Sequence, residues 1–283
     1  MLELIRRLEG RDDVSRRNIL LEELYTRNWS FQLQEYVYAE QNGCNIIVDL
    51  NQTSGPTLLL TAHYDSYFLS PGANDDASAL AILLDAGEKV KAIALACRVR
   101  IVFFDDEEPT LHWRRPIGST MYVNEFGIEG LRAMITLELC GMGDAVAIWP
   151  VEGLEDRKIL KELAGVLEEM KVPFDFGKRI PGFYADYVAF REQGLLDSYC
   201  LTTFHARERD KLLKFAEVSR AKMLARYFAW RLLRLPTVPT IFRHYHSGAD
   251  RSEYLSEQTL RMMSDVVYRT AVRLAEVIAK TEA

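Results

Sequence analysis

Short apolar runs alternate with longer segments whose apolar residues recur at the spacing of an α-helix. Strands and helices that alternate along a chain form a mainly parallel or mixed sheet with helices on both faces, so we predict a three-layer α/β/α fold. We find no internal repeat or linker and expect residues 1–283 to form a single domain. The apolar runs predict strands within 30–50 (with a turn at Asn42 and Gly43) and at 57–63, 99–104, 131–139, 145–150, 172–176 and 198–204. The periodic segments predict helices within 1–28 and at 77–95, 118–126, 153–170, 184–193, 210–233 and 256–280.

Composition and charge narrow the classes of partner. The 283 residues carry a formal net charge of −6 and have a pI near 5.5, which argues against nucleic acid because phosphate binding needs a basic face. The first 25 residues are charged throughout and contain no signal-peptide core, and no stretch approaches the ~18 apolar residues of a membrane span. The four cysteines are scattered without a CxxC pair, which favours a reducing compartment. We therefore expect a cytoplasmic protein that does not bind a membrane.

Three of the predicted strands end in acidic or histidine residues. TLLLTA leads to His63, RVRIVFFDD leads to Glu107 and Glu108, and LRAMITL leads to Glu138. The carboxyl ends of the strands in an open α/β sheet lie at one edge, so these four side chains are expected to converge. Crowded carboxylates raise one another's pKa unless a cation compensates them. Imidazole and carboxylate groups together are typical ligands of a divalent metal ion.

Each of these residues also has an ordinary explanation when it is considered alone. Asp75 or Asp76 stands where a helix begins and would serve as its N-cap. Paired glutamates after a strand are commonly solvated loop residues, and a lone histidine is as often a core residue as a ligand. Helix caps do not explain why every one of these strands ends in such a group. We therefore favour the metal site.

The segments HYD, PGANDDAS, FFDDEE, IGS and YHSGAD resemble those of the zinc aminopeptidases of the bacterial leucyl aminopeptidase type. They also resemble the glutaminyl cyclases, which are built on the same fold. The segments occur in the family order between about residues 57 and 255, which is most of the chain. The resemblance implies a metal-dependent aminopeptidase that binds two divalent ions. Zinc is the first choice, although cobalt or manganese would also suit this ligand set.

Roles for seven residues follow from this resemblance. Asp75 would bridge the two metals, and Asp65 would hold the second ring nitrogen of His63. Glu107 would be the general base that takes a proton from water and returns it to the leaving amine. The metal ligands would be His63, Asp75, Glu108, Glu138 and His246.

The resemblance also concerns the backbone at the bridging residue. Family members have a non-proline cis peptide after the bridging aspartate, so we expect one between Asp75 and Asp76. Asp76 would then cap the following helix. The substrate would be a peptide with a free N-terminus, because an acidic site rim suits an α-amino group.

Glu138 departs from the family, which usually has aspartate at this position. If Glu138 does not bind metal, Asp75, Glu108 and His246 would hold a single ion. That set is the one that glutaminyl cyclases use to close an N-terminal glutamine into pyroglutamate. A third possibility is an inactive family member that acts as a binding subunit. The retention of the other ligands and of Glu107 argues for activity.

Several further residues are candidates for supporting roles near the site. Asp186 is expected near the metals, and Tyr187 replaces a histidine that the family often has there. We expect no cysteine nucleophile, although Cys140 follows the Glu138 strand. RYFAWRLLRLP, which begins at Arg226, is expected to pack on the core, with contact in a homo-oligomer as the alternative. The remaining candidates are His205, His244 and the loop with His112, Trp113, Arg114 and Arg115 near the site, and Tyr67, Phe183 and Tyr245 in a substrate pocket.

Overall fold

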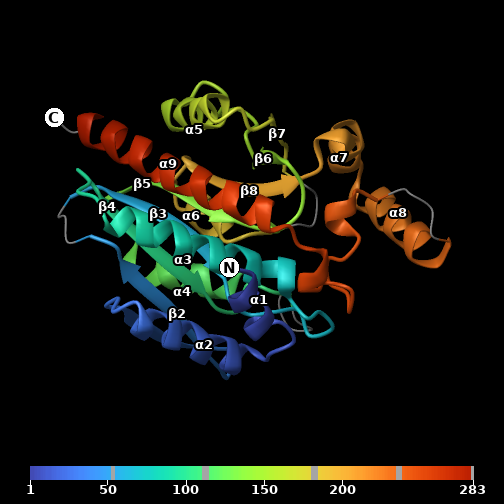
Figure 1. The fold of residues 1–283 in the computed structure, drawn as a ribbon, viewed down its shortest axis with the longest axis horizontal. Coiled ribbons are helices and arrows are strands. Elements are labelled where there is room, and N and C mark those ends of the chain that lie inside the picture. The colour runs from blue at the N-terminus through green and yellow to red at the C-terminus, as the bar shows by residue number, and fades with distance from the viewer. Residues whose placement is uncertain (52–54, 110–114, 180–183, 234–237, 282–283) are drawn as a thin grey trace.

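The computed structural model describes residues 1–51, 55–109, 115–179, 184–233 and 238–281. In these residues eight strands form one sheet with the order β1-β2-β4-β3-β5-β8-β6-β7 (Figure 1). The strands are β1 (Gln32–Tyr38), β2 (Gln41–Asp49), β3 (Thr57–His63), β4 (Arg98–Phe104), β5 (Leu131–Leu137), β6 (Ala145–Trp149), β7 (Phe174–Phe176) and β8 (Ser198–Phe204). The longer helices are α1 (Leu2–Leu8), α2 (Asp13–Thr26), α3 (Ser78–Lys91), α4 (Ile117–Phe126), α5 (Lys158–Glu169), α6 (Tyr187–Glu192), α7 (Arg209–Ala216), α8 (Arg220–Leu233) and α9 (Glu257–Thr281). Short helical turns are η1 (Ala73–Ala77), η2 (Ala206–Glu208), η3 (Thr240–Phe242) and η4 (Ser252–Tyr254).

The centre of the sheet is parallel and its flanks are mixed. The central pairs are parallel: β4 with β3, β3 with β5, and β5 with β8. Antiparallel pairs flank them: β1 with β2, β2 with β4, and β6 with β8. Helices α1, α2, α3, α5 and α9 contribute to the core on one face, and α4, α6 and α7 to the core on the other. Figure 1 shows α3 and α9 crossing in front of the sheet, with α4 and α6 behind it. The predicted three-layer α/β/α fold is confirmed.

Alternating side chains of the central strands supply the two cores. Leu58 and Leu60 of β3 belong to the core under α3 and α9, whereas Leu59 belongs to the opposite core. In β4, Phe103 and Phe104 divide in the same way. The period of two places successive side chains on opposite faces, so a strand buried on both sides reads as a continuous apolar run. All seven residues of β3 are buried, so the strand is rigidly held up to His63.

The turn expected at Asn42 and Gly43 is wrong. The chain reverses at Ala39 and Glu40, which have φ values of 47° and 67°, as a tight turn between antiparallel strands requires. Gly43 instead pairs with Tyr36 within the β1–β2 ladder. A Cβ atom at Gly43 would overlap the ring of Tyr36, so this glycine provides room for a cross-strand aromatic side chain.

The single helix expected over residues 210–233 is also wrong. The structure has two helices there, α7 and α8, separated by residues 217–219. In Figure 1, α8 projects away from the sheet. Phe228 is 56% exposed and Leu232 is 77% exposed, so the expected core packing is wrong for these two side chains. Apolar spacing within a helix does not reveal whether a partner covers the apolar face.

All four cysteines are buried and unpaired, as their scattered positions predicted. Among the described helices, none is both long enough and apolar enough to span a lipid bilayer.

Candidate metal centre

The carboxyl ends of β3, β4 and β5 bring the predicted acidic and histidine residues together. His63 is the last residue of β3, Glu107 and Glu108 follow β4, and Glu138 directly follows β5. The Nε2 atom of His63 lies 3.8 Å from Oε2 of Glu138. One ligand atom each of His63, Glu107 and Glu108 also fall within 4.8 Å of one another. The convergence expected from parallel strands is present.

Asp75 lies between the two histidines. Its Oδ1 is 3.4 Å from Nε2 of His63, and its Oδ2 is 3.5 Å from Nε2 of His246. The two oxygens of one carboxylate therefore face two different imidazoles. The expected cis peptide between Asp75 and Asp76 is confirmed.

The second histidine is fixed by a carboxylate and two aromatic rings. Nε2 of His246 lies 2.7 Å from Oε2 of Glu108. Tyr67 and Tyr245 both stack on the imidazole, with ring centroids 4.1 and 3.7 Å away. The ring therefore cannot turn without breaking two stacking contacts. Tyr67 was expected to line a substrate pocket. It stacks on His246 instead, and it is not among the described residues that line the pocket beside the metal centre.

Asp65 connects the first histidine to the second glutamate. Its Oδ1 lies 3.1 Å from Nδ1 of His63, and its Oδ2 accepts a hydrogen bond of 2.9 Å from the backbone nitrogen of Glu108. A carboxylate on Nδ1 directs the other ring nitrogen, Nε2, toward the site. This geometry matches the supporting role expected of Asp65.

Several buried polar atoms that face the centre lack a hydrogen-bond partner in the described part of the chain, and their types are those of metal ligands. Buried polar atoms normally have hydrogen-bond partners. Here several buried nitrogen and oxygen atoms converge without a hydrogen bond among the described residues, although His246 Nε2 and Glu108 Oε2 lie 2.7 Å apart as an ion pair. The set combines imidazole nitrogen with carboxylate oxygen, which are the donors that zinc and related divalent ions take. The orphaned atoms are His63 Nε2, Asp75 Oδ2, Glu108 Oε1 and Oε2, Glu138 Oε1 and His246 Nε2.

Burial and crowding shift the pKa values of these groups. Burial raises the pKa of Glu107 and Glu138 well above the usual range, and their acidic neighbours add to the effect. For the same reasons the pKa of Glu108 rises to about 7. Burial would lower the pKa of His63, but the carboxylates of Asp65 and Asp75 beside its two ring nitrogens raise it well above the usual value. Burial also raises the energy of a charged Asp75 carboxylate, but the neighbouring His63 and His246 lower its pKa overall.

The expected capping role of Asp76 is wrong. Helix α3 begins without a side-chain cap, and both carboxylate oxygens of Asp76 lack a hydrogen-bond partner in the described structure. The side chain is fully buried. It lies instead with His63 and Glu138, as one of three groups whose ligand atoms fall within 4.8 Å. The unusual backbone of η1 turns Asp76 toward the centre and away from the start of the helix.

The other predicted candidates divide into those near the centre and those away from it. Asp186 is fully buried and near enough to raise the pKa values of Glu107 and Glu138. His205 and His244 belong to none of the candidate metal groups among the described residues. Arg115 is exposed and donates to Glu192 at 2.9 Å. His112, Trp113, Arg114 and Phe183 lie outside the described residues.

Two buried charged residues beside the centre received no role from the sequence. Asp250, within YHSGAD, accepts hydrogen bonds from the backbone nitrogens of Asn74 and Asp75 at 2.8 and 3.1 Å. Arg16 of α2 is completely buried behind the same loop. Its burial could have been inferred from the sequence, because Arg16 lies on the same face of α2 as the buried residues Leu20 and Leu24.

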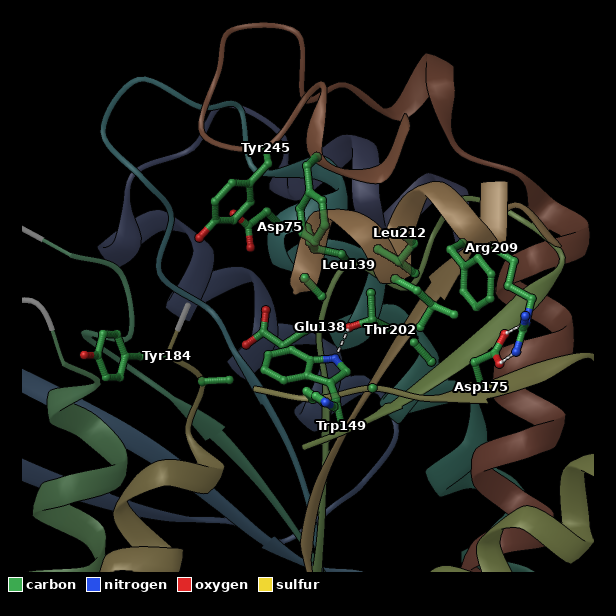
Figure 2. Close-up of a pocket in the computed structure, with 18 of the residues that line it drawn as sticks. Asp75, Glu138, Leu139, Trp149, Asp175, Tyr184, Thr202, Arg209, Leu212 and Tyr245 are labelled. Atoms are coloured by element: carbon green, nitrogen blue, oxygen red, sulfur yellow. Dashed lines mark hydrogen bonds and ion pairs between the residues drawn. The ribbon is translucent and has the colours of Figure 1, made fainter. Parts of the chain in front are cut away.

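An apolar pocket opens from the metal centre (Figure 2). Asp75 and Glu138 stand at one end of it, and Tyr245 lies above them. Trp149 forms part of the wall and donates from Nε1 to Oγ1 of Thr202 at 3.0 Å. An ion pair between Asp175 and Arg209 marks the far end. The remaining walls are mostly apolar and include Leu139, Ala147, Phe204, Leu212, Leu213, Ala216 and Phe242.

Comparison with known proteins identifies the family. A sequence model of peptidase family M28 matches residues 45–271. The chain belongs to peptidase family M28. The match spans every residue of the candidate metal centre, from His63 to His246. M28 membership supports a zinc-dependent peptidase, in agreement with the donor set.

Curated M28-like relatives match only in part. The aminopeptidase YwaD of Bacillus subtilis is 27% identical over 140 residues, which cover 48% of this chain and 30% of YwaD. The uncharacterized protein YfbL of Escherichia coli is 29% identical over 109 residues, covering 36% of this chain and 33% of YfbL. The chain thus spans about a third of the length of these relatives.

Solved structures share the fold of this M28 chain. The zinc aminopeptidase BSAP from Bacillus subtilis superimposes with a TM-score of 0.61 at 20% identity, covering 83% of this chain and 50% of BSAP. The glutaminyl cyclase of Porphyromonas gingivalis gives a TM-score of 0.71 at 15% identity, covering 95% and 96% of the two chains. At these identities the likeness establishes the fold and leaves the reaction to be argued from the site.

The raised pKa values predict a specific pH dependence of the metal-free protein. Carboxyl groups whose pKa is raised on folding bind more protons in the folded than in the unfolded state, so stability falls as pH rises. The raised pKa values of His63 and His246 act in the same direction, and the lowered pKa of His244 opposes them. Without metal, we expect the melting temperature to fall by roughly 5 °C or more between about pH 5 and pH 8.

Thermal unfolding in the presence of a chelator measures this effect. The variant Glu138→Gln has one fewer titrating carboxyl group and should show a shallower pH dependence. A melting temperature that rises across this pH range in the metal-free protein would contradict the crowding of protonated carboxyl groups.

Proposed function

We propose that this M28 protein is a two-metal aminopeptidase that removes the N-terminal residue of peptides. The observation that carries the proposal is the position of Asp75 between two imidazoles. Its oxygens divide the centre into two halves. One half has His63 and Glu138, and the other has Glu108 and His246. Two half-sites that share one carboxylate support two ions bridged by Asp75.

Glu107 is the group best placed to move protons. Bound zinc ions would polarise the scissile carbonyl and lower the pKa of a water molecule. Glu107 is buried in the centre and lines the pocket where a substrate would enter. A carboxylate in this position could take a proton from the attacking water and then give it to the leaving amine. Each of its neighbours Glu108 and Glu138 would be committed to a metal.

The pocket supports a large apolar residue at the substrate N-terminus. A peptide whose scissile carbonyl lies over the centre would direct its first side chain into the space beside Trp149 and Leu213. Asp175 is neutralised by Arg209, which binds it with two hydrogen bonds of 2.6 Å. Lys178 also lines the pocket, but its side chain is exposed. The walls are otherwise mostly apolar, so burial of apolar surface would supply the affinity.

The alternative function is a single-metal glutaminyl cyclase. Asp75, Glu108 and His246 form a compact group of three ligands on their own, and the fold matches a glutaminyl cyclase over nearly its whole length. Against this function, the single-metal reaction gives no use to His63 and Glu138. The apolar pocket also offers little to the polar side chain of glutamine.

Metal content distinguishes these two functions. We expect two equivalents of zinc in the wild-type protein and about one in Glu138→Ala, because this variant lacks one ligand of the first half-site. Plasma emission spectrometry on purified protein gives the count. One equivalent that does not change in the variant, together with cyclisation of an N-terminal glutamine peptide, would favour the cyclase.

The role of Glu107 predicts lost turnover with metal retained. We expect Glu107→Gln to lower kcat by roughly 10²- to 10⁴-fold while zinc content stays at the wild-type level, because the amide cannot accept the proton of water. Hydrolysis of leucyl 4-nitroanilide and metal analysis of the same sample measure both effects. A variant that keeps more than about a tenth of wild-type kcat would remove Glu107 from this role.

The pocket predicts a change of specificity when its wall is charged. Leu213→Asp places a carboxylate on a half-exposed part of α7 that lines the pocket. We expect kcat/KM for leucyl and phenylalanyl substrates to fall roughly 10- to 100-fold, with little change for alanyl substrates. Leu196→Asp, at an exposed leucine away from this pocket, is the matched control. Equal losses on all three substrates would contradict the assignment of the pocket.

A further inference from the structure

Residues 9–16, which comprise the turn between α1 and α2 and the first turn of α2, lie against two loops of the metal centre. One loop runs from His63 to Asp75 and the other follows His246. The turn precedes residue 45, where the family match begins, so these contacts are made by a segment outside that match. Backbone nitrogens make three of these contacts: Gly10 donates to Pro71 O at 2.7 Å, Ser66 donates to Asp13 Oδ1 at 3.1 Å, and Ser252 donates to Glu9 Oε2 at 3.1 Å.

Arg16 is the most deeply buried charge of this segment. Its side chain has an exposed fraction of 0%. Nη1 donates to the carbonyl oxygen of Gly72 at 3.2 Å, while Nε and Nη2 have no hydrogen-bond partner in the described structure. An isolated buried guanidinium is costly, so its charge must be compensated by nearby groups.

Burial lowers the pKa of Arg16, and four acidic side chains nearby oppose this effect: Asp65, Asp13, Asp76 and Asp250. Two of them hold residues of the metal centre. Asp65 binds the ring of His63, and Asp250 binds the backbone nitrogen of Asp75. The guanidinium therefore lies behind the predicted ligands and among the groups that orient them.

Gly72 shows that the structure reserves space for this guanidinium. Its φ is +70°, a conformation that glycine adopts without strain. A Cβ atom at Gly72 would overlap Nη1 of Arg16 and would lie 2.9 Å from the carbonyl oxygen of Asp75. The loop that leads to Asp75 is thus held by Arg16 on one side and by Asp250 on the other.

We propose that Arg16 is a positioning residue of the metal centre, which fixes the Gly72–Asp75 loop and balances the carboxylates that orient His63 and Asp75. This inference rests on the metal centre of the proposed function. In this proposal α1 and α2 hold the ligand-bearing loops in place before metal binds, in addition to packing on the core.

The sign of the change in metal affinity tests this role. If Arg16 acted only as a nearby positive charge, its removal would strengthen the binding of a cation. If Arg16 positions the ligands, its removal loosens the Asp75 loop and weakens binding. Substitution of a group that orients metal ligands typically lowers metal affinity by roughly 10- to 100-fold.

The experiment measures Zn²⁺ affinity of the full-length, metal-free protein by competition with a chromophoric chelator. We expect Arg16→Met to weaken binding roughly 10- to 100-fold and Arg16→Lys to restore part of the loss. Arg11→Met, at an exposed arginine of the same turn, should bind as the wild type does. The absorption bands of the Co²⁺-substituted proteins should change in Arg16→Met, since they report ligand geometry and do not depend on overall stability.

Gly72→Ala provides a second route if Arg16→Met does not fold. Its added methyl group overlaps the guanidinium and approaches the carbonyl oxygen of Asp75, so the same contact between Arg16 and the loop is disturbed and Zn²⁺ affinity should fall in the same direction. Unchanged or tighter Zn²⁺ binding in folded Arg16→Met, or in Gly72→Ala, would overturn the positioning role. A wild type that binds Zn²⁺ yet cleaves no peptide would refute the proposed aminopeptidase and leave the role of Arg16 intact.

Discussion

The structure depends on compensating negative charge at one edge of its sheet. Asp75, Asp76, Glu107, Glu108 and Glu138 are all buried there, within a small volume. Carboxylates in such a place either take up protons, pair with cations or disrupt the fold. Two histidines and one arginine supply positive charge from the chain itself, and the orphaned ligand atoms are arranged to accept more from metal ions.

This electrostatic constraint explains why distant segments meet at the site. Strand β3 is buried over its whole length and delivers His63 at a fixed depth. The His246 loop is attached to the N-terminal turn through Glu9 and to η1 through Asp250. Backbone nitrogens hold two carboxylates in place: the nitrogen of Glu108, after β4, donates to Asp65, and those of Asn74 and Asp75 in η1 donate to Asp250. The packing of α1 and α2 and the positions of the candidate ligands are consequently linked through hydrogen bonds between these segments.

The sequence predicted those features that follow from local pattern and strand direction. Apolar runs located β3, β4 and β5, and parallel order then required His63, Glu107 and Glu138 to meet. Features set by contacts between distant segments could not be predicted in this way. Arg16 reaches Gly72 across 56 positions, and no local pattern announces that contact. The break between α7 and α8 and the space at Gly43 likewise depend on neighbours that the linear pattern does not show.

Glu138 illustrates how backbone geometry can accommodate a departure from a family pattern. The β5 ladder continues through its backbone nitrogen, which donates to Leu201 O at 3.0 Å. The chain then turns at Leu139, whose φ is 55°. The side chain is therefore anchored at the last hydrogen bond of the strand, and its longer stem leads into the site. Its Oε2 still lies beside His63 Nε2, on the side of the centre where the shorter aspartate of relatives would be expected. The extra methylene of Glu138 therefore does not take its carboxylate away from His63, and the side chain stays available to the first half of the proposed two-metal site.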